Sequence, residues 1–261
     1  MRMTSLAEDG GEFEPPGVGD FFLPPIFGGV TKPMVLIVLS VVIIAVFFLL
    51  ASRNLKLVPG RFQFMAEGVY DFSRNSITRT QIGAEDFRPY VPLILTLFTF
   101  TLVNNIFGIV PIIQFPTFAH IGFPLALSVL VVYPIYHIAG IRKHGALKYL
   151  KKELFIPGVP KAIYLLLTPV EIFNKFFMNP LTLAIRVFAA MFAGHLIILV
   201  FTLGGQYLLL NADAWLKPVS AVAWVLTVGM TFLEAFIQVI QAYIFALLAA
   251  QYIGTALAEH H

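Results

Sequence analysis

Long runs of apolar residues are the feature that most limits what this chain can fold into. The clearest run covers residues 34–51 and contains no charged residue. About 20 apolar residues in a helix span the hydrocarbon core of a bilayer, and only helices and closed barrels satisfy their backbone groups there. Since 59% of the residues are hydrophobic and 12% are charged, we expect an all-α polytopic membrane protein.

The pattern predicts five membrane-crossing helices and one helix on the membrane surface. Residues 1–32, which are acidic and rich in Gly and Pro, are expected to form an extracytoplasmic N-terminal arm. Residues 33–261 are expected to form a single membrane domain, because no soluble domain or fixed repeat interrupts them. The surface helix is amphipathic, with apolar residues at three- and four-residue steps. The expected crossings are 34–51, 89–113, 121–141, 162–210 and 218–257, and the surface helix is 62–80.

Basic residues predict the orientation of the chain. The loops that follow the first and third crossings hold six basic residues each, whereas the loop after the second crossing holds none and the last turn holds one. The positive-inside rule therefore puts the N-terminus outside and the C-terminus in the cytoplasm. Because the basic residues act as topology signals, we expect no binding of nucleic acid.

The last two crossings are too long to stand upright in a bilayer. The 40 residues of 218–257 would extend roughly 60 Å as a helix, against a hydrocarbon core of about 30 Å. We expect both helices to be steeply tilted and to form a hairpin. Such a hairpin would present a broad lateral face to a neighbour within the membrane.

The apolar stretch of residues 179–201 carries Arg186 and His195. Arg186 at bilayer depth costs a few kcal/mol, so it indicates a function; the alternative is a structural charge tied to carbonyl groups or to Glu234. His195 lies nine residues later, about 180° around the helix and about 13 Å along it. The hairpin register predicts that Gln241 holds Arg186 and that Glu234 pairs with His195. A His–Glu couple can pass protons near neutral pH, and a hydrogen-bonded packing role is the alternative for His195.

Several other polar residues are weaker candidates. Asn105 would lie on the same side of the membrane as the His–Glu couple. Glu171, near the inner surface, is either a carboxylate on the exit side or an ordinary interfacial charge. Tyr133 and His137 are minor candidates for lining a wet crevice, and Gln238 is expected to be a packing residue. We expect no metal or cofactor, because the histidines are scattered and HExxH is absent.

Three segments resemble subunit a of the F-type ATP synthase membrane (Fo) sector: LVNNIFGIVP, PLTLAIRVFAAMFAGHL and EAFIQVIQAYIF. The resemblance implies that Arg186 is the essential arginine that faces the carboxylates of a rotating c-ring. It implies that His195 and Glu234 are a pair in the proton-access half-channel. Gln241 would be the glutamine beside the arginine, and Asn105 would be a polar position of the same channel.

The resemblance also implies a function and partners. The chain would be the proton-conducting, non-catalytic stator subunit of a rotary ATP synthase in a bacterial plasma membrane. It would bind the c-ring, the subunit b peripheral stalk, other subunits and the bilayer. Ala190, where the family commonly has Asn, and Gly108, where some members have Asp, imply a thinner polar lining.

Two other classes of function remain alternatives. One is a stand-alone secondary transporter in which Arg186 binds an anionic substrate, although the internal repeats typical of transporters are absent from the sequence. The other is an integral-membrane enzyme that uses His195 and Glu234 as acid and base. This second class lacks any nucleophile or metal motif.

Overall fold

The computed structural model describes residues 15–21, 24–25, 28–53, 55–154 and 161–258. Every regular element of three or more residues in this part of the chain is helical. Five helical stretches are long and apolar enough to cross a membrane, which confirms the all-α class and the predicted number of crossings. They are Lys32–Ser52, Arg88–Ile106, Gly122–His144, Leu166–Leu210 and Lys217–Leu257.

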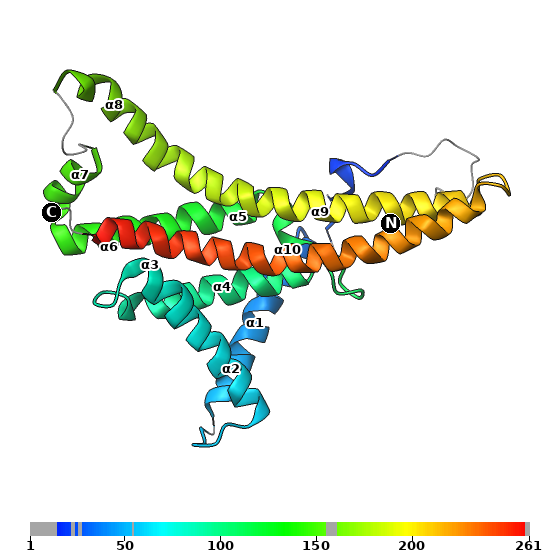
Figure 1. Cartoon of the computed structure of the whole chain (residues 1–261), viewed down its shortest axis with the longest axis horizontal. Helices are drawn as coiled ribbons and strands as arrows, with labels where there is room; N and C mark the ends of the chain where they lie inside the picture. Colours follow the sequence, from blue (N-terminus) through cyan, green and yellow to red (C-terminus); the bar gives the residue numbers. More distant parts are fainter. Residues whose placement is uncertain (1–14, 22–23, 26–27, 54, 155–160, 259–261) are drawn as a thin grey trace.

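The first crossing, α1 (Lys32–Ser52), projects away from the long axis of the molecule (Figure 1). It contacts α4 (Val91–Ile106), where Asn104 Nδ2 donates a hydrogen bond of 3.0 Å to Ser40 Oγ. The run at the position of the predicted surface helix consists of α2 (Arg61–Asp71), a π-helical stretch η3 (Phe72–Arg79) and α3 (Thr80–Ile82). This run packs against α4 and α10.

The second crossing ends earlier than its sequence suggests. A short 3-10 turn, η4 (Arg88–Tyr90), opens it, and α4 ends at Ile106 rather than near residue 113. Turn hydrogen bonds follow, such as Gly108 N to Asn105 O at 3.0 Å. Pro111 lacks an N–H group and disfavours helical backbone in the residue before it, so an apolar composition alone does not extend the helix.

Two later crossings are continuous helical stretches with a π-helical turn inside. The third consists of α5 (Gly122–Ala126), η6 (Leu127–Val132) and α6 (Tyr133–His144). The fourth consists of α8 (Lys161–Phe173), η7 (Asn174–Met178) and α9 (Asn179–Leu210). Each π-helical turn ends two residues before a proline, Pro134 or Pro180. A proline removes a helical hydrogen bond and the wider turn accommodates this loss. Figure 1 shows the resulting bend between α8 and α9.

The last two helices form the predicted hairpin. The fifth crossing, α10 (Lys217–Leu257), runs antiparallel to α9 and also packs against α4, α6 and α3. Its C-terminal half is rich in buried alanines, and Gly254 lies against the backbone carbonyl of Gln81 so closely that a Cβ cannot fit. Small residues therefore let α10 serve as the central helix of the fold.

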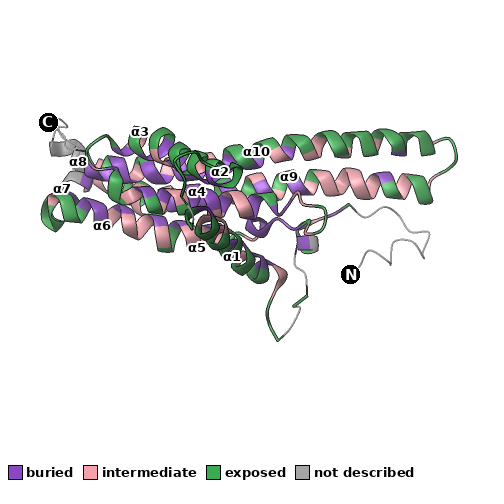
Figure 2. Cartoon of the chain, turned by 90° about the horizontal axis from the view of Figure 1, so that it is seen from below, coloured by how far each residue is buried: buried purple, intermediate pink, exposed green. Residues whose placement is uncertain are grey.

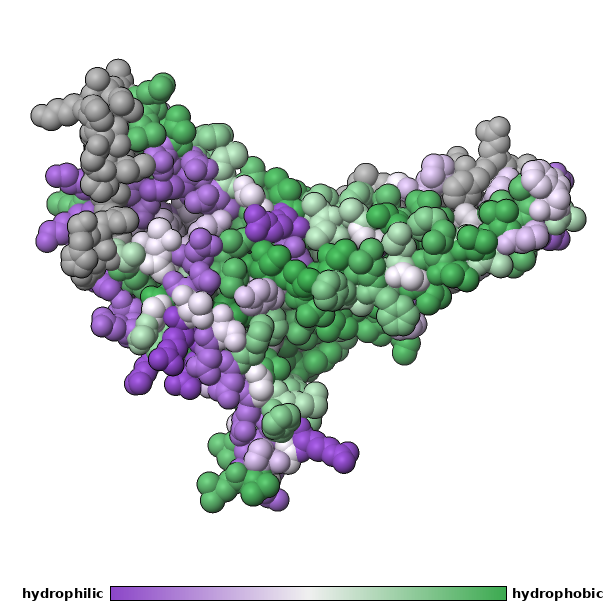
Figure 3. All heavy atoms as spheres, in the orientation of Figure 1, coloured by the Kyte–Doolittle hydropathy of each residue, from purple (hydrophilic) through white to green (hydrophobic). Residues whose placement is uncertain are grey.

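Burial is uneven along the hairpin. Figure 2 shows buried residues gathered in the half of the hairpin where α10 packs against α4 and α6 and α9 packs against α5 and η6. Toward the turn, Gly205 is the last buried residue of α9 and Ser220 is the only buried residue of α10 before Glu234. The surface over this far half is mainly hydrophobic, whereas hydrophilic residues gather near α6 and α7 (Ala146–Leu154) at the opposite end (Figure 3).

Part of the predicted N-terminal arm also packs on the hairpin. Within the described residues of this arm, the 3-10 turn η2 (Val18–Phe21) ends in a phenylalanine that is 3% exposed. The ring of Phe21 lies 4.8 Å from that of Phe192 and 5.9 Å from that of His195, measured between centroids. Residues 1–14 of the arm lie outside the described residues.

Candidate functional site

The hairpin brings His195 and Glu234 together in the interior. His195 Nδ1 lies 3.9 Å from Glu234 Oε1, and the two residues are 8% and 3% exposed. Gly194 permits this approach, because a Cβ at that position would lie 3.2 Å from Glu234 Cγ. A histidine and a carboxylate at this separation can exchange a proton through a small movement or one intervening water molecule.

Two amides extend this pair into a polar cluster that joins three helices. Gln238 Nε2 donates a hydrogen bond of 2.8 Å to Glu234 Oε1. Asn105 Nδ2, from α4, donates one of 2.9 Å to the backbone carbonyl of Gln238. We call Asn105, His195, Glu234 and Gln238 the hairpin cluster. The prediction that Gln238 only packs missed this contact, although its spacing of four residues from Glu234 places both on one helix face.

Gly108 explains how Gln238 fits into the hairpin cluster. A Cβ at Gly108 would lie 3.3 Å from Gln238 Nε2 and 3.3 Å from the backbone oxygen of Asn105. A larger side chain at this position would have to displace the amide. The side chain of Gln238 therefore supplies a polar group next to the position where the resemblance suggested a missing carboxylate.

The hairpin cluster retains unused hydrogen-bonding capacity. Within the described residues, Asn105 Oδ1, His195 Nδ1, Glu234 Oε2 and Gln238 Oε1 are buried without a hydrogen-bond partner. Buried polar atoms of this kind are rare, because each costs free energy when it is unpaired. Four of them in one cluster indicate a place where hydrogen bonds are exchanged rather than a static packing contact.

Arg186 lies apart from this cluster on an exposed strip of α9. Its neighbours on the strip include Thr182, Ile185, Ala189 and Ala193, which are all exposed. Among the described residues, the guanidinium has no hydrogen-bond partner and no ion pair. Arg186 is therefore an uncompensated charge on a largely apolar surface.

The prediction that Gln241 holds Arg186 is wrong. Gln241 is 6% exposed, and its Nε2 has no hydrogen-bond partner among the described residues. Gln241 is buried whereas Arg186 is exposed, because the register that turns His195 toward Glu234 turns Arg186, on the opposite side of α9, outward.

Glu171, the candidate for the exit side, is held in an ion pair. Its Oε2 lies 3.5 Å from Lys175 Nζ, and its side chain is 19% exposed. Lys175 Nζ also lies 3.1 Å from Glu153 Oε2. Glu171 thus joins a group of charges on the N-terminal side of Arg186, opposite to the hairpin cluster.

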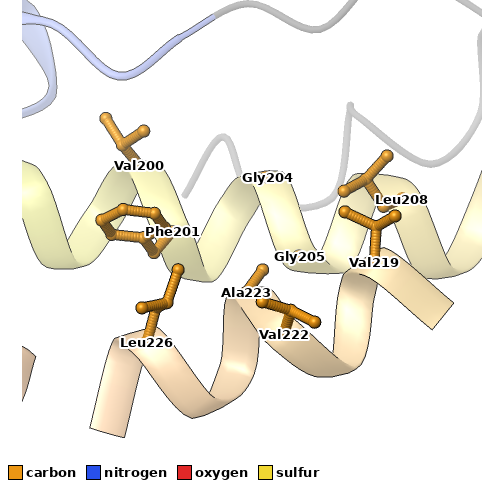
Figure 4. Close-up of a pocket in the computed structure, with 9 residues that line it drawn as sticks. All are labelled: Val200, Phe201, Gly204, Gly205, Leu208, Val219, Val222, Ala223 and Leu226. Atoms are coloured by element: carbon orange, nitrogen blue, oxygen red, sulfur yellow. The ribbon is translucent and has the colours of Figure 1, made fainter. Parts of the chain in front are cut away.

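The apolar hollow between α9 and α10 offers no competing site. The hollow in Figure 4, about 240 Å³ between α9 and α10, is lined entirely by apolar residues and glycine: Val200, Phe201, Gly204, Gly205, Leu208, Val219, Val222, Ala223 and Leu226. It provides no group that can bind a proton or a charged ligand. The described residues contain no group of three or more His, Asp or Glu side chains arranged to hold a metal ion.

Comparison with known proteins gives consistent matches along the chain. The family described as "ATP synthase A chain" matches residues 34–254. "ATP synthase subunit a" of a Nocardioides species is 45% identical, with 97% of this chain and 96% of the relative covered. The subunit of Pseudarthrobacter chlorophenolicus is also 45% identical, over the whole of both chains, and that of Streptomyces lividans is 36% identical over 97% and 91%.

Proposed function

Because the chain belongs to the ATP synthase A chain family, we propose that it is the proton-conducting stator subunit of a rotary ATP synthase. It is a membrane subunit that assembles with the other subunits of that complex, and it has no part in ATP chemistry itself. Its proposed partners within the complex are the c-ring and the subunit b peripheral stalk. Its proposed orientation has the N-terminus outside and the C-terminus in the cytoplasm.

The exposed, unpaired guanidinium of Arg186 is the observation that carries this proposal. A charge that faces lipid is costly, so it requires a neighbour that compensates it. The short side chains of Thr182, Ala189 and Ala193 leave room around it for the close approach of another helix. A helix of the c-ring, which carries a carboxylate at this depth, meets both requirements.

The mechanism follows from the electrostatics of this encounter. A c-ring carboxylate must be neutral while it faces lipid, because its ionised form is poorly solvated there. Near Arg186 the opposite charge favours the ionised form, so the carboxylate releases its proton. The fixed positive charge also repels free protons and prevents a direct leak. Each proton that crosses the membrane releases about 2.3 kcal/mol of free energy per 100 mV of membrane potential. Because crossing requires the c-ring to turn, this free energy drives rotation.

The hairpin cluster is proposed to line the half-channel that opens to the outside. His195 follows Arg186 by nine residues, so the cluster lies about 13 Å along α9 from the charge. From His195 on α9, the route continues through Glu234 and Gln238 on α10 to Asn105 on α4. Gln241 is buried next to this route on α10, and Glu171 lies on the side of the other half-channel.

Replacement of Arg186 tests the proposal. Arg186→Ala is expected to abolish ATP-driven proton pumping in inverted membrane vesicles, and Arg186→Lys is expected to fail as well. Lysine lacks the planar guanidinium and can lose its proton when it is buried. Arg142→Ala, which removes an exposed arginine at the end of α6, is the control and should pump normally. Normal pumping by vesicles that carry Arg186→Lys would refute the assignment.

Reconstitution separates this function from that of a stand-alone transporter. The chain alone in liposomes is expected to move neither protons nor anionic substrates, because the carboxylates that carry protons belong to the c-ring. Addition of the c-ring and the remaining Fo subunits should restore passive proton flow. Substrate uptake by the purified chain alone would favour the transporter instead.

A further inference from the structure

A second polar cluster lies on the other side of Arg186. It consists of Tyr136 and His137 from α6, Tyr149 and Glu153 from α7, and Lys175 from η7, and we call these residues the α6–α7 cluster. Lys175 precedes Arg186 by eleven residues, which corresponds to roughly 16 Å of helix. The α6–α7 cluster and the hairpin cluster therefore lie in opposite directions from the charge.

The α6–α7 cluster brings several proton-bearing groups together. His137 Nδ1 and the Tyr149 hydroxyl are 2.9 Å apart, and the Tyr136 ring lies 6.4 Å from the Tyr149 ring between centroids. Glu153 follows Tyr149 by four residues, on the same face of α7, and its Oε2 lies 3.1 Å from Lys175 Nζ. An imidazole, two phenols and a carboxylate thus lie close to one another.

Burial of these groups sets the cluster apart from a surface ion network. Tyr149 is 1% exposed and Glu153 is 4% exposed, although both belong to a short helix outside the membrane crossings. Burial raises the pKa of the Tyr149 hydroxyl, and the Glu153 carboxylate acts in the same direction. Tyr149 therefore keeps its proton at neutral pH, so it can pass a proton on without remaining ionised.

A glycine fixes the position of the Tyr149 hydroxyl. The Tyr149 ring covers Gly140 so closely that a Cβ there would overlap ring carbons. This contact docks α7 on α6 and holds the phenol against His137. The buried Nε2 of His137 has no hydrogen-bond partner among the described residues, so the imidazole is not locked into one protonation state by a second contact.

The cluster contacts the hairpin through Tyr136 and an accessible carboxylate through Lys175. The Tyr136 ring lies 6.3 Å from that of Tyr252 of α10 between centroids, and the charge of Arg186 acts on Tyr252. Lys175 Nζ lies 3.5 Å from Glu171 Oε2, and the Glu171 side chain is 19% exposed. The cluster therefore connects the hairpin to an accessible carboxylate.

We propose that the α6–α7 cluster relays protons between the Arg186 region and the aqueous phase beside the basic loops. This inference rests on the proposed function, because it names residues that form the second half-channel. His137 and Glu153 hold the proton in turn, and the hydroxyls of Tyr149 and Tyr136 donate one proton as they accept another. Each step breaks one O–H or N–H bond and forms another, so the relay needs no co-reactant.

Removal of one hydroxyl tests the relay. Tyr149→Phe keeps the ring against Gly140 but removes the oxygen atom that contacts His137. In vesicles that contain the assembled Fo sector without F1, passive proton flow driven by a potassium diffusion potential is expected to fall by about tenfold or more. Tyr70→Phe is the matched control, because Tyr70 is exposed on α2, away from the α6–α7 cluster. This control should conduct like the unmodified complex.

The outcomes separate a relay from a packing role. Normal proton flow through assembled Tyr149→Phe complexes would overturn the relay, because a packing role needs only the ring. If Tyr149→Phe fails to assemble, His137→Gln decides in its place: reduced flow with a changed solvent isotope effect supports the relay, and unchanged flow refutes it. Pumping by Arg186→Ala would overturn the proposed function itself. If Tyr149→Phe complexes conduct protons normally while Arg186→Ala complexes do not pump, the relay is refuted and the proposed function stands.

Discussion

At the scale of single residues, glycines determine how closely the polar side chains approach one another. Gly194 lets Glu234 reach His195, and Gly108 makes room for the amide of Gln238. Neither glycine has an unusual backbone conformation, since both are absent from the residues with positive φ. Their role is therefore to leave space for the neighbouring side chains, and a Gly→Ala substitution, which adds one methyl group, tests this role.

We predict that Gly194→Ala impairs proton transfer. The added Cβ would lie 3.2 Å from Glu234 Cγ and 3.4 Å from its Cδ, so the carboxylate must move relative to His195. A displacement of this order is expected to lower ATP-driven pumping by about tenfold, measured as quenching of a pH-sensitive dye in inverted vesicles. Gly229→Ala on α10, where no heavy atom lies within 4 Å of the new Cβ, is the control. Unaltered pumping by Gly194→Ala would contradict a tight His195–Glu234 geometry.

A second prediction concerns Gln238. Gln238→Leu removes the donor that contacts Glu234 Oε1 at 2.8 Å and leaves that buried oxygen unsatisfied, at a cost of about 1–3 kcal/mol. We expect lower pumping and a lower melting temperature of the solubilised complex. Gln251→Leu, at an exposed position of the same helix, should change neither property. Equal effects of both substitutions would show that the amide contact is unimportant.

The sequence predicted the contact partners of His195 but not those of Arg186. The antiparallel register correctly brought His195 to Glu234. The same register could not also bring Arg186 to Gln241, because Arg186 and His195 lie on opposite sides of α9 whereas Glu234 and Gln241 share one face of α10. Of the α6–α7 cluster, the sequence predicted only His137 as a candidate, because the docking of Tyr149 on Gly140 depends on tertiary packing that no periodicity encodes.

At the scale of elements, apolar runs predicted the helices and prolines decided their details. Hydropathy identified five crossings, but α4 stops before Pro111, and π-helical turns precede Pro134 and Pro180. Ser128 Oγ, within the first of these turns, donates a hydrogen bond of 2.7 Å to the backbone carbonyl of Pro180. The two irregular regions thus stabilise each other, a contact that requires the folded structure.

We predict that Gly254→Ala loosens the packing of α3 on α10. The new Cβ would overlap the backbone carbonyl of Gln81, and a backbone atom cannot move aside as a flexible side chain does. Overpacking of this kind costs about 1–3 kcal/mol, so the solubilised complex should melt at a lower temperature. Gly68→Ala in α2, which meets nothing within 4 Å, should not lower it. An unchanged melting temperature for Gly254→Ala would contradict the close crossing of these helices.

At the scale of the whole molecule, charge and burial are distributed along one axis. The hydrophilic surface gathers near α6 and α7, and the far half of the hairpin is hydrophobic (Figure 3). This polarity agrees with the orientation proposed from the basic loops. It also places the α6–α7 cluster and Glu171 near the basic end of the molecule.

The proposed orientation predicts which residues can be labelled from each side. The chain contains no cysteine, so single cysteines give a clean signal from this subunit after immunoprecipitation. Asp213→Cys, in the exposed turn of the hairpin, is expected to react with a membrane-impermeant maleimide in intact cells. Lys148→Cys on α7 should react only after the membrane is permeabilised. The reverse pattern of labelling would show that the chain has the opposite orientation in the membrane.

The sparse burial of the hairpin toward its turn separates two kinds of mutational damage. Beyond Gly205 on α9 and before Glu234 on α10, side chains contribute little to the interior of their own chain. Substitutions there should leave the subunit folded and inserted yet unable to join its neighbours, whereas changes around Ala246 and Ala250 should destroy the subunit itself. Loss-of-function alleles would then divide by position along one helix into defects of assembly and defects of folding.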